Sequence, residues 1–325
     1  MNSTFLKSFF VLAVSLAIYA CSSSKKAPTD IAGEDSLKQG QTIVPDTFLL
    51  PEIPSGITNP NVRAAYLVMH YWDRFDFANE KLTLRPEITE QAFVDYIHIL
   101  SLVSFENAKE SLNYTLRKAK MNRVMYTYFG SLFDKYLFDA NSPFRNEEYY
   151  IPVLQDLVNS DLLSEEERSR YRFQLNMALK NRVGETASDF VYTLANGESK
   201  KMHSIKSEYL LLIFSNPGCS TCASVTETLS KSDNLAMAFS MNSPSRTMIT
   251  VLTVYPDTDI DEWRSHLQHL PANWIHSYDK DRVITKQKLY DLKAIPTIYL
   301  LDREKRVILK DTSLEAIEAF FARSN

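Results

Sequence analysis

The run EYLLLIFS at residues 208–215, followed at once by NPGCSTC, limits the fold more than any other feature of this sequence. Six apolar residues in succession are typical of a strand that is buried on both faces of a sheet. Asn216, Pro217 and Gly218 then predict a turn, and a helix is expected to begin near Ser220. A strand covered on both faces requires a further layer on each side, so the segment predicts an α/β fold.

The sequence pattern changes at VGETASD, residues 183–189, and strand-like runs alternate with helical ones from there to the end of the chain. The runs are FVYTL (190–194), EYLLLIFS (208–215), TMITVLTVY (247–255), DIDEWRSHLQHL (259–270), VITKQKLYDL (283–292), IPTIYLL (295–301), RVILK (306–310) and LEAIEAFFA (314–322). Strand, helix and strand in succession indicate a parallel crossover. We therefore predict a mixed sheet flanked by helices over residues 184–325, with 208–215 as its central strand.

The preceding part of the chain, residues 46–183, is predicted to be all-helical, because its apolar residues recur at helical spacing. Asn59 is a candidate N-cap, Ser164 and Glu167 have the spacing of a capping box, and Gly130 is a candidate break. The expected helices cover residues 61–77, 83–103, 104–138, 146–158 and 164–181. The many aromatic residues of this part are interpreted as core.

Composition excludes some classes of function. The chain has 36 Lys and Arg against 40 Asp and Glu, and its formal net charge of −4 supplies no broad basic field for nucleic acid. We interpret His70 and His98 as packing or surface residues rather than metal ligands. The sequence therefore predicts no nucleic-acid partner, no bound metal and no cofactor.

The first 45 residues have the pattern of an exported and anchored protein. A lysine and an apolar run precede Cys21, which is the layout of an export signal over residues 1–20. Ile18 to Cys21 resemble a bacterial lipobox, which implies that Cys21 carries the lipid; a signal peptide cut at another nearby site is the alternative. Residues 21–45 are polar and predict a flexible tether.

If Cys21 is acylated, Cys219 and Cys222 are the two thiols left in the mature chain. Export places them where disulfides persist. Cys219 is expected at the entrance of a helix, where unpaired N–H groups and the helix dipole favour a thiolate. Cys222, one turn further on, is close enough to attack a mixed disulfide. This pattern indicates thiol–disulfide exchange.

About seventy residues later, Ile295, Pro296 and Thr297 precede a strand. Together with the cysteine pair, this arrangement resembles the thioredoxin fold over residues 184–325, and more closely the TlpA/ResA-like branch of exported thioredoxin-like proteins. The resemblance implies that Cys219 attacks and Cys222 resolves. It implies that Pro296 is a cis-proline shaping a substrate groove, to which Ile295 and Thr297 offer backbone groups. The whole layout looks like gram-negative lipoproteins whose helical domain has no known function.

The sequence also departs from the family pattern. Gly218 replaces the usual aromatic residue before the first cysteine, and Ile213 stands where thioredoxins proper bury an acid. That acid helps the resolving cysteine lose its proton, so the resemblance leaves the base open. Asp257 and Glu227 are the candidate replacements that we identify.

We therefore predict a thiol–disulfide oxidoreductase of the cell envelope, acting as a reductant. It would be lipid-anchored, face the periplasm and, by resemblance, lie on the outer membrane, since Ser22 follows Cys21. The expected partners are a disulfide-bearing protein or small thiol substrate and an upstream electron donor. The alternative is an adaptor or binding lipoprotein with a structural or inactive disulfide. A peroxidase or a zinc site fits less well, because no threonine stands just before Cys219 and no histidine lies at ligand spacing.

Overall fold

The computed structural model describes residues 47–323, which pack together as one unit. The predicted signal peptide (1–20), the tether (21–45) and the lipidation residue Cys21 lie outside the described residues, and they stay predictions. Between residues 47 and 323, no helix combines the length and the hydrophobicity needed to cross a membrane.

The helical region, residues 47–183, is built from helices alone in its described part. Its elements are α1 (Pro60–His70), η1 (Glu80–Leu84), α2 (Thr89–Leu100), α3 (Phe105–Ala119), α4 (Arg123–Phe133), η2 (Asp134–Phe138), α5 (Glu147–Val158) and α6 (Glu165–Ala178). Side chains cap most of their first turns: Asn59, Ser104, Asn122, Asn146 and Ser164 each accept backbone N–H groups. The predicted capping box of Ser164 and Glu167 is present. The all-helical prediction for this part is confirmed.

The helix predicted for residues 61–77 is wrong at its end, because α1 stops at His70. A helix continuing to Phe77 would spread its aromatic residues around the axis. The turn after His70 instead directs Trp72 and Phe77 onto Phe129, with ring centroids 5.1 Å and 5.2 Å away. Tyr71 and Trp72 are 2% and 1% exposed, which confirms their interpretation as core.

Gly130 does not break the chain as expected; it lies inside α4, and the break occurs at Asn122. A Cβ atom on Gly130 would lie 3.2 Å from Cδ2 of Leu157 and 3.4 Å from the hydroxyl of Tyr171. The missing side chain therefore lets α4 approach the two helices that carry these residues. Close packing, rather than a helix end, accounts for this glycine.

The sheet region, residues 184–323, contains a seven-stranded mixed sheet of order β2-β1-β5-β4-β3-β6-β7. Its strands are β1 (Val191–Leu194), β2 (Ser199–Lys201), β3 (Tyr209–Phe214), β4 (Ile249–Tyr255), β5 (Ile275–Tyr278), β6 (Thr297–Leu301) and β7 (Val307–Leu309). β3 runs parallel to β4 and antiparallel to β6. The predicted mixed sheet is confirmed, although the middle position belongs to β4 and the leucine-rich β3 is its neighbour.

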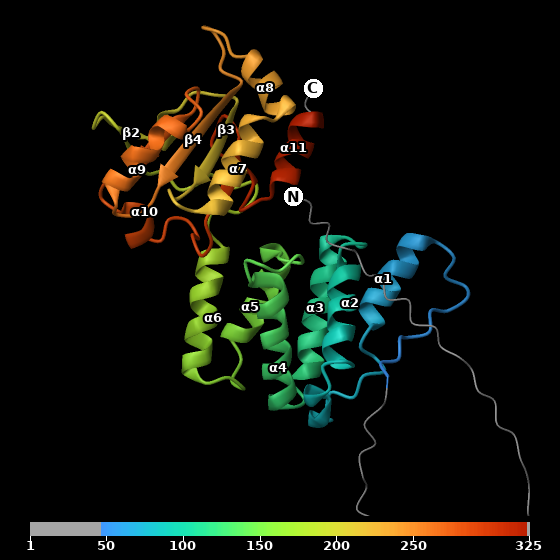
Figure 1. Cartoon of the computed structure of the whole chain (residues 1–325). Helices are drawn as coiled ribbons and strands as arrows, with labels where there is room; N and C mark the ends of the chain where they lie inside the picture. Colours follow the sequence, from blue (N-terminus) through green and yellow to red (C-terminus); the bar gives the residue numbers. More distant parts are fainter. Residues whose placement is uncertain (1–46, 324–325) are drawn as a thin grey trace, which may run out of the picture. The chain divides into compact units, whose positions relative to one another are not determined.

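Helices lie on both faces of the sheet (Figure 1). The sheet separates two apolar cores. The helical elements are η3 (Met202–Ser204), α7 (Ser220–Ser230), α8 (Asp233–Ser240), α9 (Ile260–His266), η4 (Leu267–His269), α10 (Val283–Lys286) and α11 (Leu314–Arg323). Leu211 and Ile213 face a core shared with α7, α8 and α11, whereas Leu212 and Phe214 face a core that includes Ile284 of α10. The alternation of β3 side chains between these cores explains its continuous apolar sequence.

The connector between the helical region and β1 pairs with the outer strand β7. The N–H of Gly184 donates to the carbonyl of Val307 at 2.8 Å, and the N–H of Val307 donates to the carbonyl of Glu185 at 2.9 Å. The N–H of Ala187 donates to the carbonyl of Lys305, also at 2.9 Å. The connector is therefore part of the sheet rather than a free linker.

Candidate functional site

Cys219 lies at the entrance of α7, as the sequence predicts. β3 ends at Phe214, a short turn follows, and Cys219 is the N-cap residue of the helix with extended backbone angles. Its Sγ accepts the backbone N–H of Cys222 at 3.2 Å. A sulfur atom thus takes the capping role that serine, threonine or aspartate oxygens usually have. The positive end of the helix dipole lies at the same place.

Gly218, which replaces the aromatic residue of the family pattern, is required here for two reasons. Its φ angle is +75°, in the left-handed region that residues with a Cβ rarely adopt. A Cβ atom at this position would also lie 3.2 Å from Oε1 of Glu262 on α9. The positive φ favours glycine at this turn, and a side chain there would also require Glu262 to move.

Cys222 has a different environment although it lies only one helical turn away. It is 4% exposed, while Cys219 is half-buried. Burial, and secondly the contact with the Cys219 thiol, raise the pKa of Cys222 from 9.0 to about 12. At neutral pH Cys222 therefore holds its proton. The two sulfur atoms are chemically distinct before any substrate arrives.

The structure brings the predicted proline segment to the cysteines. The Ile295–Pro296 peptide bond is cis. The Sγ of Cys219 lies 3.8 Å from the carbonyl oxygen of Ile295, to which its thiol donates. Thr297 opens β6, is 1% exposed and pairs with Phe214 at the end of β3. Because β3 and β6 are adjacent and antiparallel, the segment before β6 meets the turn after β3.

A cavity of about 290 Å³ opens beside both cysteines on the side of α9. Part of its wall comes from residues 259–271, which carry Trp263, His266, Leu270 and Pro271. Trp263 is 3% exposed and packs against Tyr278 with ring centroids 5.0 Å apart. The cavity therefore gives the thiols an apolar neighbour that the sequence pattern did not reveal.

The position of the buried family acid is filled by Ile213, which is 1% exposed, and a polar pair lies beside it. Thr253 is the β4 partner of Ile213 and lines the cavity, and His276 is the β5 partner of Thr253. Nε2 of His276 lies 2.9 Å from the Pro271 carbonyl, and Nδ1 lies 2.8 Å from the Thr253 hydroxyl. Since a carbonyl only accepts, Nε2 carries the hydrogen and Thr253 donates to Nδ1. Burial lowers the pKa of His276, so the ring is neutral at pH 7.

Sequence reasoning missed Thr253 and His276, because only the strand register brings them together. Of the two acids that it named, Glu227 lines the cavity, but its carboxylate pairs with Lys231 at 2.6 Å. Asp257 is exposed and accepts the backbone N–H of Thr258 at 2.9 Å; it does not line the cavity. Within the described residues, neither carboxylate forms a hydrogen bond with Cys222.

Comparisons with known proteins assign the two regions separately. Residues 20–181 match a family described as a domain of unknown function (DUF5106), and residues 207–307 match a family described as thioredoxin-like. A thioredoxin-like protein from Bacteroides caccae is 42% identical, and its crystal structure covers 87% of this chain and 100% of its own, with a TM-score of 0.83.

Two shorter structures also match. The C-terminal domain of an uncharacterized protein from Bacteroides fragilis is 41% identical over 44% of this chain and 98% of its own, with a TM-score of 0.41. A conserved protein of unknown function from the same species is 34% identical over 43% of this chain and 98% of its own, with a TM-score of 0.40. A comparison with curated proteins gives no match.

Proposed function

We propose a function for this chain on the basis that it belongs to the family of thioredoxin-like proteins. The proposed function is that of a thiol–disulfide oxidoreductase, with Cys219 as the attacking thiol and Cys222 as the resolving thiol. The observation that carries this proposal is the position of the Cys219 sulfur. It lies 3.2 Å from the N–H of Cys222 at the start of α7 and 3.8 Å from the carbonyl of Ile295. Helix N–H groups stabilise negative charge on a sulfur atom, and the Ile295 segment offers a surface for a substrate.

The proposed reaction has two steps. The thiolate of Cys219 attacks one sulfur of a substrate disulfide, a mixed disulfide forms, and the other substrate sulfur leaves and takes up a proton. Cys222 then loses its proton and attacks Cys219 Sγ, which forms the Cys219–Cys222 disulfide and releases the second substrate thiol. The substrate gains two electrons and two protons, which an upstream donor must return to the cysteine pair. Because burial holds the pKa of Cys222 near 12, the second step depends on removal of that proton.

The substrate class that we propose is a disulfide-bearing protein or the disulfide form of a small thiol compound. The backbone of Ile295 and Thr297 would bind an extended peptide as an added strand, with Pro296 shaping the groove. The half-buried Ile295 and Pro296 are accessible for this contact, whereas Thr297 contributes its main chain only, since it is 1% exposed.

Trapping the mixed disulfide tests the proposal. Cys222→Ser removes the resolving thiol, so substrates should remain bound to Cys219 and be released by dithiothreitol. The matched control is Cys219→Ser, which keeps one thiol of the pair but not the attacking one and should trap nothing. The redox potential of the pair decides the direction, and a value near the reducing end supports a reductase. Equal trapping by both variants, or by neither, would contradict the proposal.

An adaptor function with an inactive disulfide is the second candidate. Ile213 in place of an acid favours it, because no carboxylate at that position assists the departure of the Cys222 proton. Oxidised glutathione and insulin distinguish the two functions. Turnover of either, lost in Cys219→Ser, supports the oxidoreductase, and a cysteine pair that resists both supports the adaptor.

We further propose that the protein is anchored by a lipid on Cys21 and faces the periplasm, on the outer membrane. The support is the apolar run before Cys21 and the polar segment after it. The protein that carries Cys21→Ser should be absent from the membrane fraction or keep its signal peptide. Unchanged fractionation and lipid labelling would refute the anchor without affecting the redox proposal.

A further inference from the structure

The segment that leads into the proline loop is held by the helical region. After α6, the ammonium group of Lys180 donates to the carbonyl of Gln287 at 3.3 Å and to the carbonyl of Lys288. The side-chain amide of Asn181 donates to the carbonyl of Leu289 at 2.8 Å. Backbone carbonyls of the sheet region that follow α10 are therefore satisfied by side chains of the helical region.

Lys293 makes the contact nearest to the active site. Its ammonium nitrogen lies 3.4 Å from Oε1 of Glu147, the first residue of α5, and 3.0 Å from Oδ2 of Asp291. The same nitrogen lies 3.7 Å from the centroid of the Phe138 ring. Lys293 as a whole residue is exposed, but its side chain is only 20% exposed and that of Glu147 10%, so water screens this pair less than a fully exposed pair. Two carboxylates and an aromatic face thus fix one cation.

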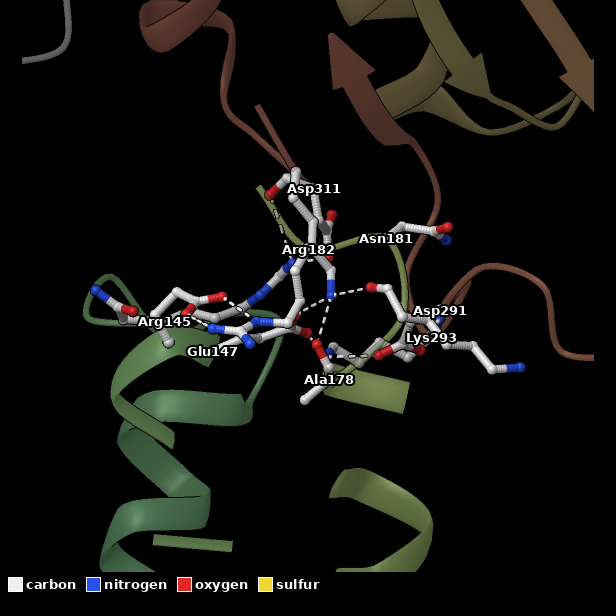
Figure 2. Close-up of polar contacts among 12 residues, drawn as sticks. Arg145, Glu147, Ala178, Asn181, Arg182, Asp291, Lys293 and Asp311 are labelled. Carbon is white, nitrogen blue, oxygen red and sulfur yellow. Dashed lines mark hydrogen bonds and ion pairs between the residues drawn. The ribbon is translucent and has the colours of Figure 1, made fainter. Parts of the chain in front are cut away.

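Glu147 is shared with a second lysine from a different part of the sheet region. The ammonium group of Lys310, which follows β7, lies 2.7 Å from Oε2 of Glu147. It also donates to the carbonyls of Ala178 at 2.9 Å and Lys180 at 2.7 Å. Figure 2 shows Glu147, at the start of α5, close to Ala178 and to Asp291 and Lys293 of the sheet region. Glu147 therefore stays paired when either lysine alone is replaced.

Lys293 lies close in sequence to Ile295, the residue whose carbonyl contacts Cys219. Only Ala294 separates Lys293 from Ile295, whose carbonyl lies 3.8 Å from Cys219 Sγ. Successive Cα atoms are about 3.8 Å apart, so the Cα atoms of Lys293 and Ile295 lie at most about 7 Å from each other. We expect a backbone displacement at Lys293 to extend to the proposed peptide-binding residues.

We infer that the helical region positions the proline loop of the redox site, and that Lys293 is the positioning residue. The inference depends on the proposed function only where it predicts an effect of Lys293 on turnover. Its structural part concerns the order of the loop and stands without any reaction. The domain of unknown function thereby gains a specific role, because it fixes one wall of the substrate groove.

Hydrogen exchange on the full chain tests the structural part. Lys293→Met keeps the length and apolar stem of the side chain but loses its charge, and Glu147 keeps its Lys310 partner. We expect amides within 289–299 to exchange about tenfold faster in this variant, because the loop opens locally. The matched control is Lys310→Met, which removes the other cation of Glu147; its effect should fall on residues 178–180 and 308–312. No change in Lys293→Met, or the same change at 289–299 in the control, would overturn the inference.

Kinetics then test the consequence for the site, with insulin as substrate and dithiothreitol as electron source. Lys293→Met should raise KM about tenfold through misplaced binding groups, while alkylation of Cys219 by iodoacetamide stays within about twofold of wild type. Equal KM values for wild type and Lys293→Met would refute this consequence. If the wild type reduces neither insulin nor oxidised glutathione, the proposed function fails, and the exchange experiment still decides whether Lys293 positions the loop.

Discussion

The two chain segments that meet at the site are held in place by different forces. The cysteine arm, residues 209–222, is fixed by burial: Leu210, Leu211, Leu212 and Phe214 are 0% exposed. The proline arm, residues 293–301, has an equally buried strand, but the chain that leads into it is held by charged and polar contacts from the helical region. One arm is a core element, and the other begins at a polar contact between regions.

The difference matters because the two forces respond to different perturbations. Burial is non-directional and tolerates small changes of side-chain geometry if volume is kept. Polar contacts between partly buried groups depend on distance and direction, and losing one partner leaves the other unsatisfied. We therefore expect core mutations to act on stability through the cysteine arm, and charge mutations to act on the shape of the proposed substrate groove through the proline arm.

The largest effect is expected from Phe214→Ala in the cysteine arm. Phe214 is 0% exposed and packs against Tyr290 with ring centroids 4.9 Å apart. Removing the ring should lower the free energy of unfolding by about 3–5 kcal/mol, measured by urea denaturation. Met237→Ala, at a residue that is 48% exposed, is the control and should change it by less than about 0.5 kcal/mol. Similar losses in both variants would contradict burial as the force that holds this arm.

The second prediction separates the two thiols within the cysteine arm. At pH 7, iodoacetamide should label Cys219 about 100-fold faster than Cys222, because Cys222 is buried and its raised pKa keeps it protonated. The ratio should fall as pH rises toward about 12, since the Cys222 thiolate fraction then increases. Mass spectrometry of the reduced protein measures both rates, and the urea-unfolded chain should label both residues alike. Equal labelling in the folded protein would remove the distinction on which the mechanism depends.

Gly218→Ala tests the turn that joins β3 to α7. A φ of +75° and a Cβ 3.2 Å from Oε1 of Glu262 should together lower the free energy of unfolding by about 1–2 kcal/mol. Adding Glu262→Ala should recover the part due to the contact and leave the backbone part. Gly56→Ala is the control, because a Cβ there meets nothing within 4 Å. If Gly218→Ala left the free energy of unfolding unchanged, the turn would accommodate a side chain without strain, which would contradict this prediction.

The smallest effect is expected from Lys180→Met on the polar approach to the proline arm. Lys180 is half-buried, but its carbonyl partners belong to the exposed residues Gln287 and Lys288, so the free energy of unfolding should fall by only about 0.5 kcal/mol. Amide exchange near residues 287–289 should nevertheless increase, whereas the control Lys200→Met on β2 should leave it unchanged. If Lys180→Met lowered the free energy of unfolding as much as Phe214→Ala does, the chain that leads into the proline arm would be a core element. The proposed difference between the two arms would then be wrong.

The cysteine arm could be predicted from sequence because each of its determinants is local. A continuous apolar run, a turn with Gly218 and a cysteine at the helix start lie within fourteen residues, 209–222. Each feature has a direct backbone consequence, and the structure places each one as expected. Of the two reasons for glycine at 218, the contact with Glu262 was not visible, since that residue comes from another helix.

The contacts that hold the proline arm could not be predicted. Glu147 and Lys293 lie 146 residues apart, and in a sequence each looks like an ordinary solvated surface charge. Gly130 was misread for a similar reason, because its partners Leu157 and Tyr171 come from later helices. Thr253 and His276 depend on strand register. Such pairings follow from tertiary packing and have no signal in local periodicity.

The connector that pairs with β7 also protects the protein against self-association through a sheet edge. An open sheet edge presents unpaired N–H and C=O groups that can template another chain. Gly184 and Glu185 pair with Val307 of β7, and Ala187 pairs with Lys305 just before that strand; at the opposite edge β2 is short and carries Lys200 and Lys201. A fragment that begins at Val183 keeps the first edge covered, while one that begins at Ser188 exposes it. Light scattering of the two fragments should therefore show self-association of the shorter one. The residue at which the fragment begins thus determines whether the sheet region remains monomeric.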